Sequence, residues 1–403
     1  MNVLLITGHF PPEDSGGAGR PYSLYKYLPR YGVNVYVITK NAFGELKDES
    51  NIYRFDSFAN WRSQGILSAK GISRLISFIG YKLFHIYTDT WWSRQVLAQV
   101  EDIITKRMID TVYVTYPSAE VLKLGLQIKA KYKVRLVSEF RDGLVFEPIV
   151  ANHNALQRYK SAALERKIVA ESDLVITIGN TISDYFRRKY KAKHIYTVFN
   201  GFDPEDFPDP MAALNRADGQ SKTRIANFGS LSASRKGNRV DLFVALKRLK
   251  DEGRISPAGF ELSFIGRFTE IERSLIAKYG LQDLVRFYPS VSKKAGFKDL
   301  YENYNYLLFY GVEGEKSIIS SKLVEYINLD LPIIGICKGN EAEEIIANTG
   351  TGVVCDFDAE SIYTTFVRLI DQQIDYRPDK QEIEKFNRQR QAGQISELLL
   401  KDT

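Results

Sequence analysis

Two charged residues lie in segments of the kind that commonly carry the catalytic or binding residues of an α/β protein. Lys236 lies in a loop after the first strand pattern of the second half of the chain, and Glu325 lies within an apolar helix pattern. A lysine in such a loop can bind a phosphate group, and a buried carboxylate can accept hydrogen bonds from hydroxyl groups. These two residue types suit a ligand that carries both phosphate and hydroxyl groups.

The loop around Lys236 predicts an anion site. It runs Gly229-Ser230-Leu-Ser-Ala-Ser-Arg235-Lys236, between a strand pattern and a helix pattern that begins near Val240. A cation in a strand-to-helix loop that faces an interdomain cleft is well placed to hold a leaving diphosphate. The alternative is an Arg-Lys pair that is merely solvated at the surface.

A second anion site is predicted at the start of the helix that carries Glu325. Ser320 is the expected N-cap, so the backbone N–H groups of residues 320–322, which include Ser321 and Lys322, would point out of the helix start. The helix beyond is apolar, and a buried Glu325 carboxylate needs a partner such as the hydroxyl pair of a ribose. The alternative is an ordinary surface glutamate.

A glycine-rich loop follows the first strand pattern of the chain and contains Gly16 and Gly17. Glycines let backbone N–H groups approach an anion, and the helix that follows adds a partial positive charge. The spacing is not that of a dinucleotide-binding loop, and Asn41 stands after the second strand pattern where an acid would bind a ribose. A dinucleotide cofactor is therefore disfavoured, and a plain turn is the alternative.

These loops belong to a regular alternation of strand and helix patterns. The strand patterns of the first half are residues 3–7, 33–39, 111–115, 134–138, 174–178 and 194–199. Those of the second half are residues 224–228, 261–265, 285–288, 306–309, 332–336 and 353–355. Most are apolar on both faces, as in a buried parallel sheet. The sequence therefore predicts an α/β fold with two Rossmann-like, doubly wound domains that face each other across a cleft.

Length and composition agree with this division. The chain has 403 residues, of which 44% are hydrophobic and 26% charged, so a disordered, collagen-like or coiled-coil protein is excluded. Residues 203–223 hold three prolines and five acids, as a linker would. Two cysteines and four scattered histidines give no metal-ligand spacing, so no metal is expected. No apolar run is long enough for a signal peptide or a membrane span, and a cytoplasmic location is expected.

The two halves differ in charge. Residues 1–200 carry 28 Lys and Arg against 18 Asp and Glu, a net charge of +10, whereas residues 201–403 have a net charge of −4. Within the basic half, residues 60–94 combine an apolar stripe at helical spacing with Lys70, Arg74 and Lys82, followed by Trp91-Trp92. Such a stretch can lie on an anionic membrane. Alternatively, the stripe packs on the sheet of the first domain.

Taken together, the motifs resemble those of the family-4 retaining glycosyltransferases, which have the two-domain GT-B fold. The matching segments are FPPEDSGGAGR, YVTYPS, VRLVSEFRDG, SDLVITIGNTISDYF, VFNGFD, NFGSLSASRKG, LSFIGRF, VRFYPSVS and SSKLVEYINLDLPIIGI. They occur in order from residue 1 to about residue 355. The SSKL-x-EY form is similar to that of enzymes that build bacterial surface polysaccharides.

The resemblance implies an acceptor-side domain over residues 1–200, joined by a C-terminal crossover helix over residues 380–403. It implies a nucleotide-sugar-binding domain over residues 201–379. Gly16 and Gly17 would touch the donor diphosphate, and Lys236 matches the phosphate-binding lysine of the family. Ser230, after Gly229, replaces a usual arginine, for which Arg235 or Lys322 would substitute.

Further donor contacts are implied in the second domain. Glu325 matches the second glutamate of the family's E-x7-E motif, which binds the ribose hydroxyls. Ser317 falls where the first glutamate usually stands, and Glu313 and Glu315 are out of register with it. The segment after Gly266 and the segment around Tyr288–Val291 would flank the nucleobase.

On the acceptor side, Arg141 and Asp142 match the FRD motif of the subgroup. They would lie beside the cleft and orient an acceptor or a sugar hydroxyl. The alternative is an Arg–Asp pair that stabilises its loop. His9 also stands at a strand end, where a lone histidine is more often structural.

The function expected from this resemblance is metal-independent transfer of a hexosyl residue with retention of configuration. The donor would be a UDP- or GDP-sugar and the acceptor a saccharide, lipid-pyrophosphate-linked, in cell-surface polysaccharide biosynthesis. No cofactor and no nucleic-acid partner are expected, and the enzyme would be peripheral on the inner face of the plasma membrane. Two alternatives remain open: a non-catalytic nucleotide-sugar-binding subunit, favoured by Ser230 and Ser317, and a nucleotide-sugar 2-epimerase of the same fold.

Overall fold

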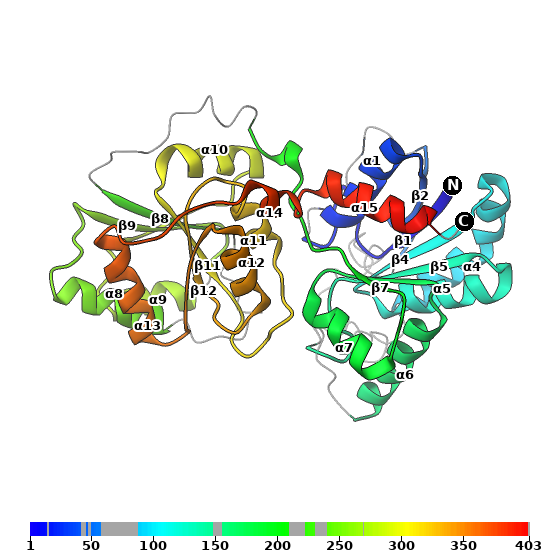
Figure 1. Cartoon of the computed structure of the whole chain (residues 1–403), viewed down its shortest axis with the longest axis horizontal. Helices are drawn as coiled ribbons and strands as arrows, with labels where there is room; N and C mark the ends of the chain where they lie inside the picture. Colours follow the sequence, from blue (N-terminus) through cyan, green and yellow to red (C-terminus); the bar gives the residue numbers. More distant parts are fainter. Residues whose placement is uncertain are drawn as a thin grey trace, which may run out of the picture. The chain divides into compact units, whose positions relative to one another are not determined.

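The computed structural model describes residues 1–13, 16–41, 46, 50–57, 88–147, 155–208, 222–229, 240–268 and 270–401. The chain divides into two compact units (Figure 1). The first comprises Met1–Phe199 together with Arg388–Thr403, and the second comprises Asn200–Asn387. The chain therefore passes between the units twice, after Phe199 and before Arg388.

The first unit is built on a seven-stranded parallel sheet. Its strands are β1 (Asn2–Thr7), β2 (Asn34–Lys40), β3 (Ile52–Phe55), β4 (Thr111–Tyr116), β5 (Arg135–Phe140), β6 (Leu174–Thr177) and β7 (Ile195–Thr197). The order is β3-β2-β1-β4-β5-β6-β7, and all pairings are parallel. The direction of winding reverses between β1 and β4. In sheets of this kind, ligands bind beyond the carboxyl ends of the strands at such a reversal.

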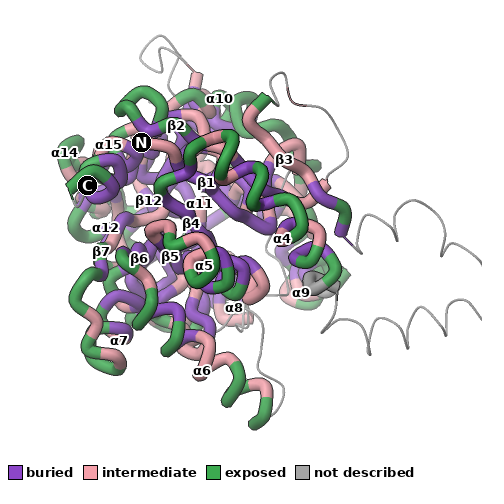
Figure 2. The backbone as a smooth tube through the Cα atoms, turned by 90° about the vertical axis from the view of Figure 1, so that its right-hand side faces the viewer, coloured by how far each residue is buried: buried purple, intermediate pink, exposed green. Residues whose placement is uncertain are grey.

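Helices cover both faces of this sheet. They are α1 (Gly19–Tyr27), η1 (Leu28–Tyr31), α4 (Thr88–Arg107), α5 (Ala119–Tyr132), α6 (Ala155–Glu171), α7 (Asn180–Tyr190) and α15 (Arg388–Leu400). Val3 and Leu5 belong to a core with α1 and α15, whereas Leu4 and Ile6 belong to a core with α4 and α5. The central strands are buried in Figure 2, and the outer turns of α5 and α7 are exposed. Burial on both faces explains why the strands have no polar alternation.

The second unit has a six-stranded parallel sheet. Its strands are β8 (Thr223–Phe228), β9 (Phe260–Ile265), β10 (Val285–Tyr288), β11 (Tyr306–Tyr310), β12 (Ile333–Ile336) and β13 (Gly352–Cys355). The order is β10-β9-β8-β11-β12-β13, with the reversal between β8 and β11. The helices are η3 (Pro204–Asp206), α8 (Val240–Asp251), α9 (Glu270–Lys278), α10 (Lys293–Asn303), α11 (Ser321–Tyr326), α12 (Glu341–Thr349), α13 (Ala359–Ile370) and α14 (Lys380–Glu384).

The predicted fold class is confirmed, since both units are doubly wound parallel α/β sheets. Two elements differ from the sequence prediction. The strand β3 was missed, and the single C-terminal helix expected over residues 380–403 is broken into α14 and α15. The break coincides with the second passage between the units, where the Phe202 N–H donates to the Phe386 carbonyl at 2.9 Å.

The basic stretch over residues 60–94 lies mostly outside the described residues. Of its two tryptophans, Trp92 is fully buried in the core of the first unit, whereas Trp91 is 45% exposed. Trp92 is therefore a core residue and does not face a membrane, whereas membrane attachment of the rest of the stretch stays a prediction. No helix within the described residues combines the length and apolar character needed to cross a membrane.

Candidate functional site

Two glycines bring two loops together at the carboxyl end of β8. Gly229 follows β8 with φ of +97°, and Gly266 follows β9 with φ of +149°. A Cβ on Gly266 would lie 2.8 Å from the carbonyl carbon of Gly229, so a larger residue would force the loops apart. The Gly229 N–H donates to the Ile265 carbonyl at 2.7 Å. The result is a close approach of two glycine backbones beside the reversal point of the second sheet, a place suited to a phosphate group.

The predicted N-cap at Ser320 is confirmed. Ser320 has extended backbone angles, and its side chain accepts a hydrogen bond from the Leu323 N–H at 3.4 Å. The helix α11 that follows has only six residues, shorter than the apolar pattern suggested. Ser320 and Ser317 are buried, and Ser321 and Lys322 are half-buried.

Glu325 is buried in α11, as the sequence predicted, but its observed partner is a lysine. The Lys293 Nζ lies 2.6 Å from Glu325 Oε1 and 3.2 Å from Asp206 Oδ2. The side chain of Glu325 is only 9% exposed, so its charge needs this partner. No described residue donates to the second oxygen, Oε2, which leaves one side of the carboxylate available.

Lys322 and Tyr326 tie α11 to the end of β8. The Lys322 Nζ donates to Asn227 Oδ1 at 3.1 Å, and the Phe228 N–H donates to the Tyr326 hydroxyl at 2.6 Å. A Cβ on Gly229 would lie 3.3 Å from Lys322 Cε, so the lysine runs beside the glycine loop. The structure thus brings together Gly229, Gly266, Lys322 and Glu325.

Three predicted donor residues remain, together with the two glutamates that are out of register with the family motif. Ser230, Arg235 and Lys236 lie outside the described residues, so their roles remain predictions. Glu313 is exposed, and Glu315 contributes its carbonyl to a hydrogen bond from Asn340. Neither glutamate has a hydrogen bond or ion pair to the Glu325 cluster within the described residues.

In the first unit, the glycine loop lies beside the end of β5. Gly16 is exposed, and the carbonyl of Gly17 accepts a hydrogen bond from Arg141 Nη1. The loop also packs on His9, whose Nδ1 lies 2.9 Å from Glu13 Oε1. A Cβ on Gly17 would be 3.3 Å from the His9 ring. His9 therefore has a local structural partner.

Arg141 is buried, and its hydrogen bonds go to two backbone carbonyls and not to Asp142, unlike in the Arg–Asp pair considered as an alternative. Its Nε donates to the Tyr116 carbonyl at 2.9 Å, and Nη1 donates to the Gly17 carbonyl. Its buried Nη2 has no partner among the described residues. Two bonds thus fix the guanidinium between the ends of β4 and β5 and the glycine loop, and its Nη2 group makes no hydrogen bond to the described residues.

Asp142, the next residue, is half-buried and makes no hydrogen bond or ion pair with the residues that the structure describes. Burial raises the pKa of Asp142 to about 7, although the charge of Arg141 acts in the opposite direction. Burial, with a contribution from Asp142, also raises the pKa of Tyr116 above its usual range. An arginine donor and a carboxyl group that titrates near neutral pH therefore lie together at the carboxyl edge of the first sheet.

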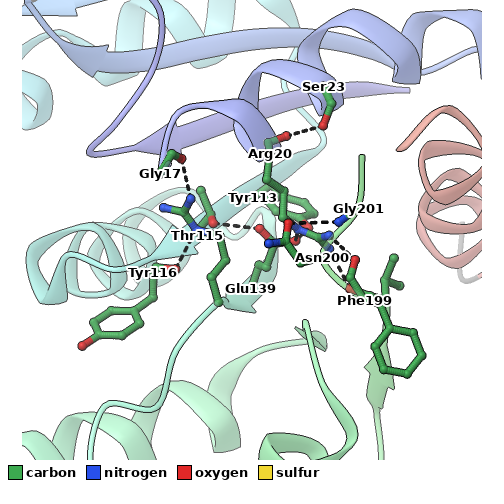
Figure 3. A network of polar contacts seen from close by, with 12 residues as sticks. Gly17, Arg20, Ser23, Tyr113, Thr115, Tyr116, Glu139, Phe199, Asn200 and Gly201 are labelled. Carbon is green, nitrogen blue, oxygen red and sulfur yellow. Dashed lines mark hydrogen bonds and ion pairs between the residues drawn. The ribbon is translucent and has the colours of Figure 1, made fainter. Parts of the chain in front are cut away.

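A buried network beside these residues was missed in the sequence. Arg20, the second residue of α1, donates from Nε to Glu139 Oε1 at 2.8 Å. Glu139, in β5, also accepts from the Tyr113 hydroxyl at 2.8 Å and the Thr115 hydroxyl at 2.7 Å (Figure 3). The ring of Tyr116 points away from this network in Figure 3. Burial alone would raise the pKa of Glu139, but the charge of Arg20 and the Thr115 hydroxyl lower it overall.

One signal in the sequence could have revealed this network. Glu139 is an acid in an otherwise apolar central strand, and such a residue requires a cation from elsewhere in the fold. Arg20, directly after the glycine loop, supplies that cation.

Comparison with known proteins agrees with this architecture. Two doubly wound parallel α/β units in one chain are the architecture of the GT-B class of fold. Residues 15–206 match the family model described as Glycosyltransferase Family 4. Over these residues the chain is therefore similar to the family-4 glycosyltransferases, as its motifs indicated. No curated protein matches its sequence significantly.

Solved structures share the fold over nearly the whole chain. Sucrose-phosphate synthase from Thermosynechococcus elongatus has a TM-score of 0.67 at 16% identity, covering 99% of this chain and 98% of that one. The lipopolysaccharide outer core galactosyltransferase WaaB has a TM-score of 0.62 at 14% identity, with both chains fully covered. Anabaena Alr3699/HepE, solved in complex with UDP and glucose, has a TM-score of 0.61 at 15% identity, covering 99% of each chain.

The same fold occurs in a second enzyme class. A structure described as a putative UDP-N-acetylglucosamine 2-epimerase from Listeria monocytogenes has a TM-score of 0.56 at 11% identity, covering 100% of this chain and 97% of that one.

Proposed function

We propose that the protein transfers a hexosyl residue from a UDP- or GDP-sugar to a saccharide acceptor, with retention of configuration and without a metal ion. The acceptor is lipid-linked, and the product belongs to cell-surface polysaccharide biosynthesis. One observation carries the proposal: the buried Glu325 carboxylate, with one oxygen available, lies in a cluster with Lys322 and the paired loops of Gly229 and Gly266.

The chemistry of this cluster suits a nucleoside diphosphate. Gly229 has no side chain to keep a phosphate away from its backbone, and the Lys322 ammonium adds positive charge beside it. Glu325 can accept hydrogen bonds from a ribose. Lys236, seven residues after Gly229, would contribute a further cation. The complex of HepE with UDP and glucose supports this choice of donor.

On the acceptor side, the Nη2 group of Arg141 and the carboxyl of Asp142 are suited to orienting a sugar hydroxyl. The leaving diphosphate itself would help to deprotonate the incoming hydroxyl on the same face of the sugar. The protein would then act by positioning the reactants and stabilising the charge of the leaving group. The likeness to the galactosyltransferase WaaB supports a saccharide acceptor.

The direct test is nucleotide release from a panel of UDP- and GDP-sugars, with and without saccharide acceptors. We expect release that depends on an acceptor with one donor, and a product with the anomeric configuration of that donor by NMR. If nucleotide release does not depend on an acceptor for any of the donors, the proposed transfer reaction is contradicted.

A 2-epimerase is the second candidate, because proteins of that class share this fold. It would interconvert UDP-N-acetylglucosamine and its 2-epimer with no acceptor present. Incubation of the protein with this nucleotide-sugar alone, followed by NMR, separates the two activities.

A further inference from the structure

The ribose-binding candidate Glu325 is held by a residue from a different part of the sequence. Lys293 is the first residue of α10, and its Nζ lies 2.6 Å from Glu325 Oε1. The lysine comes after β10, on the far side of β9 and β8 from β11, which precedes Glu325. The ion pair therefore joins segments from the two halves of the second sheet.

Packing around β8 explains how the two residues meet. The Phe297 ring of α10 lies 5.7 Å from the Phe228 ring at the end of β8. On the other side, Tyr326 of α11 exchanges hydrogen bonds with the backbone of Phe228. Both helices thus rest on the same residue, which immediately precedes the glycine loop at Gly229.

A second carboxylate restrains the lysine. Asp206, in η3, lies 3.2 Å from the Lys293 Nζ, and the neighbouring Phe207 ring stacks on Phe297 at 4.6 Å. The Lys293 side chain is 46% exposed, but two ion pairs limit its freedom. Its ammonium group is therefore fixed beside Glu325 and at the edge of the solvent.

This arrangement has a chemical consequence for a ribose. Lys293 pairs with Oε1 of Glu325 and orients the carboxylate, while Oε2 receives no hydrogen bond from the described residues. It also offsets the negative charge of Glu325, which would otherwise repel a nearby diphosphate. We propose that Lys293 is a positioning residue of the donor site, which fixes the Glu325 carboxylate so that it recognises the ribose hydroxyls. This inference rests on the proposed function.

The test measures the preference for ribose over deoxyribose nucleotides. If Lys293 only held α10 and α11 together, its loss would not change this preference. The dissociation constants of UDP, 2′-deoxy-UDP, GDP and 2′-deoxy-GDP are measured by calorimetry for the full chain and its variants. For the wild type we expect about tenfold tighter binding of the ribonucleotide, the usual effect of one charge-assisted hydrogen bond. Lys293→Met should reduce this ratio to about one, and Lys293→Arg should restore most of it.

Two controls separate this role from general effects on α10. Lys298→Met removes an exposed lysine of the same helix, paired with Glu302 at 3.9 Å, and should leave the ratio unchanged. Asp206→Asn removes the second partner of Lys293 but keeps its bond to Glu325, so the ratio should persist. Lys293→Gln, which keeps a polar side chain at this exposed position, covers the case in which Lys293→Met folds poorly and should likewise reduce the ratio to about one.

The outcomes distinguish the inference from the function. If Glu325→Gln loses the preference for ribose but Lys293→Met and Lys293→Gln keep it in full, the lysine only ties two helices together and the inference is wrong. If the wild type binds neither UDP nor GDP, the proposed function fails and the inference fails with it.

Discussion

Arg20 and Glu139 form a buried ion pair, with 2.8 Å between Nε and Oε1 and both side chains at most 4% exposed. The same guanidinium donates to the carbonyls of Phe199 at 2.6 Å and Val198 at 3.0 Å. These are the last residues of the first unit before the chain leaves it. One arginine, placed by the helix that follows the glycine loop, thus joins the central strand β5 to the point where the chain exits.

Glu139→Gln should destabilise the protein by about 3–5 kcal/mol, because it leaves the Arg20 charge buried without its partner. Urea denaturation at pH 7 measures this. The matched control is Glu101→Gln, which removes an exposed pair with Lys131 and should cost far less stability than Glu139→Gln. Equal effects of the two changes would show that the buried pair has no special role.

The ion pair between Arg20 and Glu139 also predicts that the stability of the protein depends on pH. The pKa of Glu139 is lower in the folded protein than its usual value, so its contribution to stability is present above that usual value and is lost as the pH falls through the folded pKa. Between pH 7 and pH 3, the wild type should therefore lose more stability than Glu139→Gln does.

Lys236→Ala should reduce kcat/KM by an amount equivalent to about 2–4 kcal/mol of transition-state stabilisation, because a contact with the leaving phosphate is lost. The prediction rests on the sequence, since Lys236 stands seven residues after the glycine at the end of β8. Steady-state kinetics with the active donor measure it. Lys247→Ala, at an exposed residue paired with Asp251, is the control and should retain full activity. An unchanged turnover of a folded Lys236→Ala variant would remove this lysine from the site.

The basic first half predicts attachment to anionic membranes. Each lysine or arginine near such a surface contributes about 1 kcal/mol, so four of them suffice for weak binding that falls as salt rises. Co-sedimentation with anionic vesicles at low salt compares the wild type with a variant in which Arg62, Lys70, Arg74 and Lys82 are changed to Gln. We expect the variant to bind less. Equal binding, or no binding by the wild type, would argue for a soluble acceptor.

The sequence was sufficient to predict the regular part of the fold. Most strands lie within two residues of their predicted bounds because a parallel strand buried on both faces needs a continuous apolar run. The strand β3 was missed because it is a four-residue edge strand with Arg54 in it, and only Phe55 is fully buried. The break between α14 and α15 depends on the pairing of Phe202 with Phe386, which no local pattern can reveal.

The sequence predicted the residues of the candidate site better than it predicted their ion-pair partners. Ser320 as N-cap and Glu325 as a buried acid follow from local patterns, and both are confirmed. The partner of Glu325 is Lys293, 32 residues away on another helix, and the partner of Glu139 is Arg20, 119 residues away. Such pairs form only when the sheet brings distant segments together, so the sequence predicts the need for a partner but not its identity.

Asp142 gives the last prediction, because burial raises its pKa to about 7. In the unfolded chain this carboxyl ionises near pH 4, so between about pH 4 and pH 7 the folded state holds more protons. Its contribution to stability is therefore fully present below pH 4 and is lost as the pH rises through 7. Asp142→Asn should remove this loss, which makes the variant more stable than the wild type at pH 8 by the order of 2 kcal/mol.

The activity should change in the opposite direction. If Asp142 orients an acceptor hydroxyl, its ionised form accepts the stronger hydrogen bond, so the KM for the acceptor should fall as the pH rises through about 7 while the KM for the donor does not. Asp142→Asn should show a raised acceptor KM without this pH dependence. Denaturation and kinetics from pH 5 to pH 9 measure both effects on the same two proteins. A stability gain at pH 8 together with an unchanged acceptor KM would place Asp142 outside the acceptor site, because the carboxyl would then be buried without touching the substrate.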